Sequence, residues 1–221
     1  MKKTALIVAG GNGSRMESDL PKQFILLAGK PILMHTIEAF AHCNVSNIIV
    51  VLPSNQIDFW NELCTEFSFH LGHQIVAGGA SRFESVQNGL VLCNEEDLVA
   101  IHDGVRPFIT AEIINNSFDV ASQKGNAVAA VRLKDSIRKV DLLGNKNVNR
   151  DAYFLIQTPQ TFKCNIIKEA YQVQDHFNFT DDASVLEASG HAINLIPGDY
   201  KNIKITTPED LFVAEAFYKH Q

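Results

Sequence analysis

The chain has 221 residues and a formal net charge of −6, and 46% of its residues are hydrophobic against 20% charged. This composition is typical of a globular domain with enough apolar residues for a core, and it excludes a disordered chain. The acidic balance argues against a nucleic-acid binder, which carries a basic face, and no apolar run approaches the ~18 residues of a membrane span. We therefore expect one domain over residues 1–221, with neither nucleic acid nor membrane as a partner.

Predicted strands and helices alternate along the chain. Short apolar runs indicate buried strands, and apolar residues at helical spacing indicate helices. In chain order we predict a strand at 4–8, a helix at 31–43, a strand at 47–52, a helix at 56–67, a strand at 74–76, a helix at 81–93, a strand at 98–102, a helix at 110–124, and strands at 126–131, 192–196 and 203–205. This alternation is typical of a three-layer α/β sandwich with a mostly parallel, twisted sheet.

The last predicted helix has a start signal of its own. Thr207 suits the N-cap, Pro208 the first helical position, and the acids Glu209 and Asp210 the first turn. A threonine side chain accepts a hydrogen bond from an unpaired backbone N–H there, and acids interact favourably with the helix dipole. We expect the helix to begin directly after Thr207.

Residues 133–153 interrupt the alternation of strands and helices. Polar and apolar residues alternate there around Gly144 and Asn145, which we place in the turn of a β-hairpin. A polar excursion of about 20 residues would be poorly stabilised on its own. We therefore predict a protruding hairpin arm that docks on a second subunit, with a loose loop as the alternative.

A glycine-rich loop follows the first predicted strand. Gly10, Gly11 and Gly13 let the backbone approach a ligand closely, and successive exposed N–H groups form a cradle for anions. Arg15 and Lys22 supply the compensating charge. The loop lacks the third glycine of a dinucleotide-binding motif and the Gly-Lys-Ser/Thr ending of a P-loop. We expect a polyphosphate site, and hence a nucleotide, with a plain strand-to-helix turn as the alternative.

Two further clusters follow predicted strands. Gly79 belongs to a second glycine turn that opens a helix, and Ser85 lies one turn into that helix, which suits a base or a ribose. Asp103 and Arg106 follow the strand at 98–102, where an aspartate beside a triphosphate suits Mg²⁺ or a ribose hydroxyl. Because ligands of parallel α/β sheets bind beyond the carboxyl ends of the strands, these residues belong to the same expected site as the first loop.

Two later segments suit a second anionic substrate. Arg150 and the segment 157–161 provide a cation and hydroxyl groups. Lys204 stands between two apolar neighbours in a predicted strand, and a lysine among buried residues usually has an anionic partner. We therefore expect a second phosphate to be bound beside the first.

Cysteines and histidines stand apart from most of these clusters. The four cysteines are dispersed, without Cys-x-x-Cys spacing, and we expect free thiols and a cytoplasmic location. His102 ends a buried strand and is expected to be structural, while His70 and His73 are expected on a surface connection with metal binding as the alternative. No cysteine or histidine nucleophile is expected.

Together these motifs resemble one enzyme family. The opening loop with Pro21 and Lys22 is similar to that of the nucleotidyltransferases that activate sugars and polyols. The later motifs resemble the 2-C-methyl-D-erythritol 4-phosphate cytidylyltransferase family of the non-mevalonate isoprenoid pathway, and they lie at 78–79, 85, 103–107, 150, 158–160, 180–184 and 202–204. The likeness runs from Ala5 to the last helix.

The resemblance implies a Rossmann-like homodimeric enzyme that transfers CMP from CTP to 2-C-methyl-D-erythritol 4-phosphate, with Mg²⁺ or another divalent cation. It implies catalytic roles for Arg15, Lys22 and Lys204. It implies that CTP is bound by Ala9, Gly10, Gly11, Gly13, Gly79, Ser85, Asp103 and Gly104. It implies that the polyol phosphate is bound by Arg106, Ser136, Arg150, Thr158 and Thr180, some of them across the dimer.

The chain departs from the family's pattern at three places. The family often has Pro-Ala-Ala-Gly at residues 8–11, an acid at Ala80 and threonine at Ser136. Ser136 keeps a hydroxyl and residues 8–11 keep a tight turn, so Ala80 is the departure that bears on contacts to the base.

The residue types suit direct phosphoryl chemistry. A phosphate monoester is already anionic at neutral pH, so the nucleophile needs no general base, only positioning and charge neutralisation. We expect in-line attack without a covalent enzyme intermediate. The nearest alternative is a ribitol-5-phosphate cytidylyltransferase, and a non-catalytic nucleotide-binding protein is a remote one. A glycosyltransferase is disfavoured because the chain contains no Asp-x-Asp.

Overall fold

The computed structural model describes residues 1–10, 20–142, 144–172 and 179–220, so the predictions at Gly11, Gly13 and Arg15 lie outside the described residues. The strands of the main sheet are β1 Lys3–Val8, β4 Asn47–Leu52, β5 Gln74–Ala77, β6 Leu98–Asp103, β7 Asn126–Arg132, β10 Phe154–Lys163 and β11 Leu195–Pro197. The helices are α1 Ile32–Ala41, α2 Ile57–Glu66, α3 Arg82–Leu90, α4 Ala111–Lys124, α5 Cys164–Ala170, α6 Asp182–Ala188 and α7 Pro208–Lys219.

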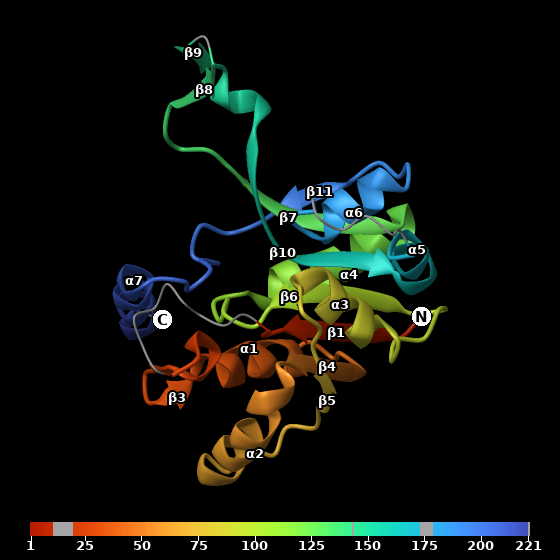
Figure 1. The fold of residues 1–221 in the computed structure, drawn as a ribbon, viewed down its shortest axis with the longest axis vertical. Helices are drawn as coiled ribbons and strands as arrows, with labels where there is room; N and C mark the ends of the chain where they lie inside the picture. Colours follow the sequence, from red (N-terminus) through yellow and green to blue (C-terminus); the bar gives the residue numbers. More distant parts are fainter. Residues whose placement is uncertain (11–19, 143, 173–178, 221) are drawn as a thin grey trace.

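Seven strands form one sheet in the order β11-β7-β10-β6-β1-β4-β5 (Figure 1). β10 runs antiparallel to both of its neighbours, β6 and β7, and the other pairings in this sheet are parallel. The expectation of a mostly parallel sheet is therefore confirmed. Since β1 and β6 are neighbours in parallel register, their carboxyl ends, Val8 and Asp103, lie side by side.

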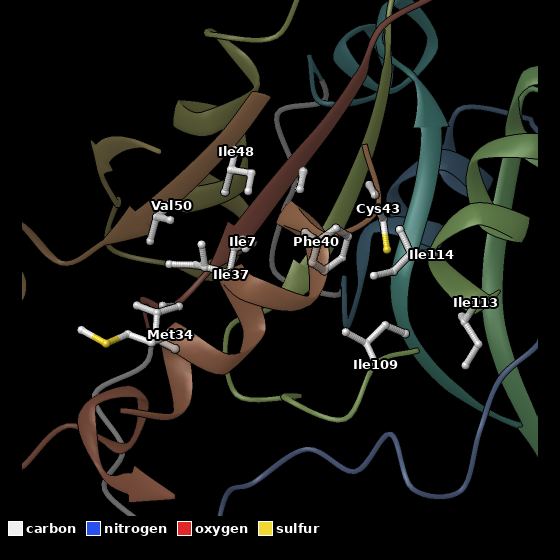
Figure 2. Packing of buried hydrophobic residues seen from close by; sticks show 14 of the residues in the cluster. Ile7, Met34, Ile37, Phe40, Cys43, Ile48, Val50, Ile109, Ile113 and Ile114 are labelled. Carbon is white, nitrogen blue, oxygen red and sulfur yellow. The ribbon is translucent and has the colours of Figure 1, made fainter. Parts of the chain in front are cut away.

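Helices cover both faces of this sheet. Along β1, Ala5 and Ile7 point into one core cluster with α1, α2 and α4, whereas Leu6 points into another with α3, α5 and α6. This alternation follows from the two-residue period of a strand. Figure 2 shows Phe40 and other α1 residues beside Ile7 of the sheet. The predicted three-layer α/β architecture is confirmed.

One predicted strand is absent and three strands were missed: β10 in the main sheet, and β2 Leu26–Leu27 and β3 Lys30–Pro31, which pair in antiparallel fashion as a small sheet of their own. Residues 203–205 form no strand, because the Ile205 N–H donates to the Val105 carbonyl at 3.0 Å without a continuing ladder. The missed strand of the main sheet is β10, whose register shifts between Ile156 and Gln160. A proline and several polar residues lie at that irregularity, which is why the segment resembles a loop in sequence. The short helices α5 and α6 were also not predicted.

The start of α7 and the state of the cysteines agree with the predictions. The Thr207 side chain accepts a hydrogen bond from the N–H of Asp210, and the Asp210 side chain accepts one from the N–H of Thr207, which makes a capping box. All four cysteines are free thiols. Among the helices that the structure describes, none combines the length and apolar character needed to cross a bilayer.

Removing this cap has a predictable cost. Thr207→Ala is expected to lower the free energy of unfolding by about 1 kcal/mol, because an N–H of the first turn of α7 loses its acceptor. Urea unfolding followed by circular dichroism measures the change. Thr207→Ser, which keeps the hydroxyl, should stay close to the wild type, and an equal loss in both variants would contradict the assignment.

A further two-stranded sheet is formed by the part of the chain that connects β7 to β10. It consists of β8 Ile137–Asp141 and β9 Gly144–Val148 in antiparallel pairing, and Figure 1 shows it standing away from the main sheet at the top of the view. Asp141 pairs with Gly144 and Val140 with Asn145, so Gly144 and Asn145 belong to the second strand, and the prediction that they form the turn was wrong. The pairing of β8 with β9 continues up to Asp141 and Gly144, which leaves both predicted turn residues inside the ladder.

Candidate active site

Two adjoining cavities open at the carboxyl ends of β1 and β6. The larger cavity, of about 310 Å³, is lined on one side by these strand ends and on the other by the turn before α3. The smaller cavity, of about 220 Å³, is lined by β10 and by the residues that precede α6. Arg82, Asp103 and Lys204 line both, so the two cavities meet at these side chains.

Most predicted site residues within the described chain gather at these cavities. The larger cavity brings together Ala9, Gly10, Lys22, Gly79, Ser85, Asp103 and Lys204. The smaller cavity adds Arg106, Thr158 and Thr180. Gly104, Ser136 and Arg150 line neither cavity. The structure thus unites residues that the sequence spreads over almost two hundred positions.

Lys22 is held by its two successors. It begins the short 3₁₀ helix η1, Lys22–Phe24, and lines the larger cavity. Gln23 is fully buried and donates a hydrogen bond to the Gln56 side chain at 2.6 Å, while the buried ring of Phe24 stacks on Trp60. Because both following side chains are anchored in the body of the protein, the backbone at Lys22 is held at the mouth of the cavity.

The turn before α3 forms the opposite wall. The Ser85 hydroxyl donates to the Ser81 carbonyl at 2.8 Å and accepts from the Gly79 N–H at 3.2 Å, so it shapes this turn in addition to lining the cavity. A Cβ on Gly79 would collide with the Glu84 side chain. The glycine therefore permits the close approach of the turn to α3, as the sequence pattern indicated.

Asp103 carries the negative charge at the meeting point. Its Oδ2 accepts from Arg106 Nε at 3.0 Å and lies 3.2 Å from Lys204 Nζ. Burial alone would raise the pKa of Asp103, but the neighbouring cations, led by Lys204 and Arg106, hold that pKa well below its usual range. The carboxyl group is therefore ionised, and the two cations are fixed around it.

Gly104 supports this arrangement from outside the cavities. Its N–H donates to the Val8 carbonyl at 2.9 Å, and a Cβ at this position would lie 3.0 Å from the Ala9 Cβ and from Leu33. The glycine thus lets the ends of β1 and β6 come together. Gly104 packs between the strand ends and does not line the larger cavity. The structure therefore offers no support for the predicted direct contact of Gly104 with CTP.

His102 lies fully buried beneath the meeting point. Its Nε2 donates to the Arg106 carbonyl at 3.2 Å, so Nδ1 accepts, from the Thr158 hydroxyl at 3.0 Å. The same hydroxyl accepts the Asp103 N–H at 3.0 Å. This agrees with a structural role for His102. It also means that the hydroxyl hydrogen of Thr158 is engaged inside the protein.

Protonation of His102 is expected to destabilise the fold. Burial is the main cause that lowers its pKa from 6.5 to about 4. Because the unfolded chain then binds the proton more readily, stability is complete above pH 6.5 and falls as the pH drops towards 4, by roughly 3 kcal/mol. Urea unfolding at a series of pH values measures this.

The matched variant is His102→Gln, which has no titrating ring. Its deficit in unfolding free energy relative to the wild type should shrink as the pH falls from 6.5 to 4, because only the wild type loses stability through this ring. His70→Gln, at an exposed position, controls for the loss of a histidine. A deficit that stays constant with pH would contradict the prediction.

Ser136 and Arg150 lie in the segment that carries β8 and β9. Ser136 is exposed, and Arg150 begins the 3₁₀ helix η3, Arg150–Ala152, where its guanidinium donates to the Lys134 carbonyl. Neither side chain lines either of the two adjoining cavities of its own chain. The predicted contact of these two residues with the polyol phosphate is thus not formed by the two cavities of their own chain.

The donor set suits a divalent cation that a substrate brings with it. Both cationic partners of Asp103 contact Oδ2, so among the described residues Oδ1 keeps its lone pairs for a metal. No group of three or more His, Cys, Asp and Glu side chains in the described part of the chain is arranged to hold a metal. One carboxylate beside a polyphosphate is the type of site that Mg²⁺ uses.

The comparisons with known proteins identify the family. The sequence profile of 2-C-methyl-D-erythritol 4-phosphate cytidylyltransferase matches residues 4–220. The chain belongs to this cytidylyltransferase family. A protein of that name from Bacteroides thetaiotaomicron is 47% identical over 217 residues, which cover 98% of this chain and 99% of the relative.

Solved structures of the cytidylyltransferase family have the same fold. The 4-diphosphocytidyl-2C-methyl-D-erythritol synthase of Anaerococcus prevotii is similar with a TM-score of 0.86 and 28% identity, over 99% of this chain and 96% of that one. The 2-C-methyl-D-erythritol 4-phosphate cytidylyltransferase of Thermus thermophilus gives 0.83 and 29%, over 99% and 100%.

In this cytidylyltransferase the structure adds residues that the sequence analysis did not assign. Arg82 lines both cavities, and Gln160 and Asp181 line the smaller one. Gln160 donates to the Asp181 side chain at 2.9 Å and accepts the Ala183 N–H at 2.7 Å, which ties β10 to α6. Arg82 stands inside the second glycine motif, so its charge was the signal available. Gln160 lies inside the motif at 158–160, but its role was not assigned, because its partners come from a distant segment.

Proposed function

We propose that this protein transfers CMP from CTP to 2-C-methyl-D-erythritol 4-phosphate, giving 4-diphosphocytidyl-2-C-methyl-D-erythritol and pyrophosphate. The observation that carries the proposal is the pair of adjoining cavities with Lys204 and Asp103 where they meet. The larger cavity has the glycine turns and Lys22 that suit a nucleoside triphosphate. The smaller one has Arg106 and hydroxyl groups that suit a polyol phosphate.

The reaction needs two anions to be held together. A phosphate oxygen of the acceptor attacks the α-phosphorus of CTP and forms the new P–O bond. The bond from this phosphorus to the β-phosphate oxygen breaks, and pyrophosphate leaves with the electron pair. Lys22 and Lys204 contribute by positioning the α-phosphate and neutralising the charge that develops on it and on the leaving group.

A bound Mg²⁺, or another divalent cation, would neutralise further phosphate charge. Asp103 is the candidate ligand, since its carboxyl group is ionised and Oδ1 is available among the described residues. The ion would otherwise be held through the phosphates of CTP. We also propose a cytoplasmic location, which the free state of all four cysteines supports.

We further propose a homodimer formed through the segment 133–153. Apolar side chains at its base are exposed, among them Tyr153, Phe154 and Leu155, and Leu142 at its tip is fully exposed. A second copy would cover them and would receive Ser136 and Arg150 near its smaller cavity. The resulting interface would use the same surface of both subunits.

Complementation between two defective variants tests this arrangement. Lys22→Ala and Arg150→Ala are each expected to be inactive as homodimers. Co-expressed with different tags and purified as the mixed dimer, they should recover activity, because one of the two sites then has its own Lys22 and the partner's intact arm. Sedimentation measures the oligomeric state. A mixed dimer as inactive as its parents would contradict action of Arg150 across the interface.

The first test of the function is pyrophosphate release from CTP and Mg²⁺ with 2-C-methyl-D-erythritol 4-phosphate or D-ribitol 5-phosphate as acceptor. A preference for the methylerythritol acceptor is the expected result. A preference for ribitol phosphate would transfer the same mechanism to the alternative substrate. If neither acceptor leads to pyrophosphate release, the proposed transfer is overturned and a nucleotide-binding protein without this activity is favoured.

A further inference from the structure

Arg82 stands where the two cavities meet. It is the first residue of α3 and lines both cavities, as Asp103 and Lys204 do. In a transfer between two phosphates, the reacting groups must come together where their binding sites join. Arg82 enters this place from α3, whereas Lys204 enters it from the segment before α7, so the two cations come from different parts of the fold.

A buried carboxyl group holds the guanidinium of Arg82. Nη1 donates to Asp182 Oδ1 at 2.9 Å and Nη2 donates to Oδ2 at 2.6 Å. The Asp182 side chain is 0% exposed and also accepts the Tyr171 hydroxyl at 2.6 Å. The Tyr171 ring in turn stacks on Phe83, with ring centroids 4.5 Å apart. The bidentate pair therefore fixes the orientation of the guanidinium, and Tyr171 in turn holds the carboxyl group of Asp182.

The pair with Asp182 leaves donors for a substrate. It uses one N–H of each terminal nitrogen, so the Nε–H and two further N–H groups remain on the guanidinium. The Arg82 side chain is 30% exposed, whereas Asp182 is buried and lines neither cavity. The planar fork of arginine matches phosphate oxygens. The pair therefore presents its cation, and not its carboxylate, to the two cavities.

We propose that Arg82 contacts the phosphates of both substrates where they meet, and that Asp182 and Tyr171 are positioning residues that hold it there. The inference rests on the proposed function, since it concerns the same two anions. A rigid cation between them lowers their mutual repulsion in the ground state and as charge shifts to the leaving group. The competing interpretation is that the ion pair only joins α3 to α6.

Two variants that break the same pair separate these interpretations. Arg82→Gln removes the cation, and Asp182→Asn removes only the negative charge of its buried partner. The melting temperature should fall in both variants, because each loses the ion pair, and it should fall at least as far in Arg82→Gln, which leaves the buried carboxylate without its cation. kcat should fall about 100-fold in Arg82→Gln but less than about tenfold in Asp182→Asn, which keeps the guanidinium at the junction. Arg82→Lys should recover part of the loss.

A fall in kcat that is at least about tenfold larger for Arg82→Gln than for Asp182→Asn supports the proposal, and a smaller difference overturns it. Calorimetric titration with CTP and Mg²⁺ gives the same comparison without turnover, with weaker binding expected for Arg82→Gln than for Asp182→Asn. Inactivity of the wild type with these substrates would count against the proposed function alone, because the titration would still decide the role of Arg82.

Discussion

Replacement of Lys22 by alanine is expected to lower kcat about 1,000-fold while the protein stays folded. Lys22 lines the cavity that suits the nucleotide, and its backbone is held by the buried side chains of Gln23 and Phe24. A lysine held in this way neutralises phosphate charge without having to be reorganised during the reaction. The loss should therefore appear in kcat more than in KM. Steady-state pyrophosphate release measures both.

The matched control is Lys30→Ala. Lys30 belongs to the same part of the chain, but its ammonium group pairs with Glu38 at 2.6 Å and lines neither cavity. Its removal should leave kcat within about twofold of the wild type, since surface ion pairs contribute little. Thermal unfolding establishes that both variants are folded. Turnover by Lys22→Ala within about tenfold of the wild type would refute the catalytic assignment.

Replacement of Lys204 by glutamine is expected to lower kcat/KM at least about 100-fold for both substrates. Lys204 lines both cavities, and its Nζ lies 3.2 Å from Asp103 Oδ2. The substitution removes a cation from the place where the two cavities meet. Of the two ion-pair partners of Asp103, only Arg106 then remains among the described residues. Both the missing attraction and the less compensated negative charge of Asp103 act against two anionic substrates.

Lys201→Gln is the control for Lys204→Gln. Lys201 is an exposed lysine of the same segment and does not line either cavity. Kinetics with CTP varied at saturating acceptor, and with acceptor varied at saturating CTP, show whether both substrates are affected. An effect on one substrate only would place Lys204 inside a single cavity and contradict its position at the junction.

Local patterns were sufficient for the elements whose signals are local. The alternation along β1 and the capping box at Thr207 depend on neighbours a few residues away, so the printed order of residues specifies them. β10 was missed because its ladder is irregular at residues 157–159 and its partners come from β6 and β7, far away in sequence. The placement of such a strand is a property of the whole sheet.

The candidate site divides in the same way. Glycines at turns and cations beside them were enough to predict that Gly10, Lys22, Gly79 and Ser85 share one site, because the conformational freedom of glycine and the charge of lysine are properties of the residue. The structure brings these residues together at the larger cavity. The sequence patterns did not reveal that the Ser85 hydroxyl is engaged in its own turn.

Only the tertiary structure decided which charges face one another. Arg82 and Asp182 are 100 positions apart, and Lys204 reaches Asp103 from the far end of the chain. Coulomb attraction and desolvation depend on distance and burial in space, which residue order alone does not specify. The sequence thus determined which charged and flexible residues the protein has, and the packing of the sheet determined where their side chains are brought together.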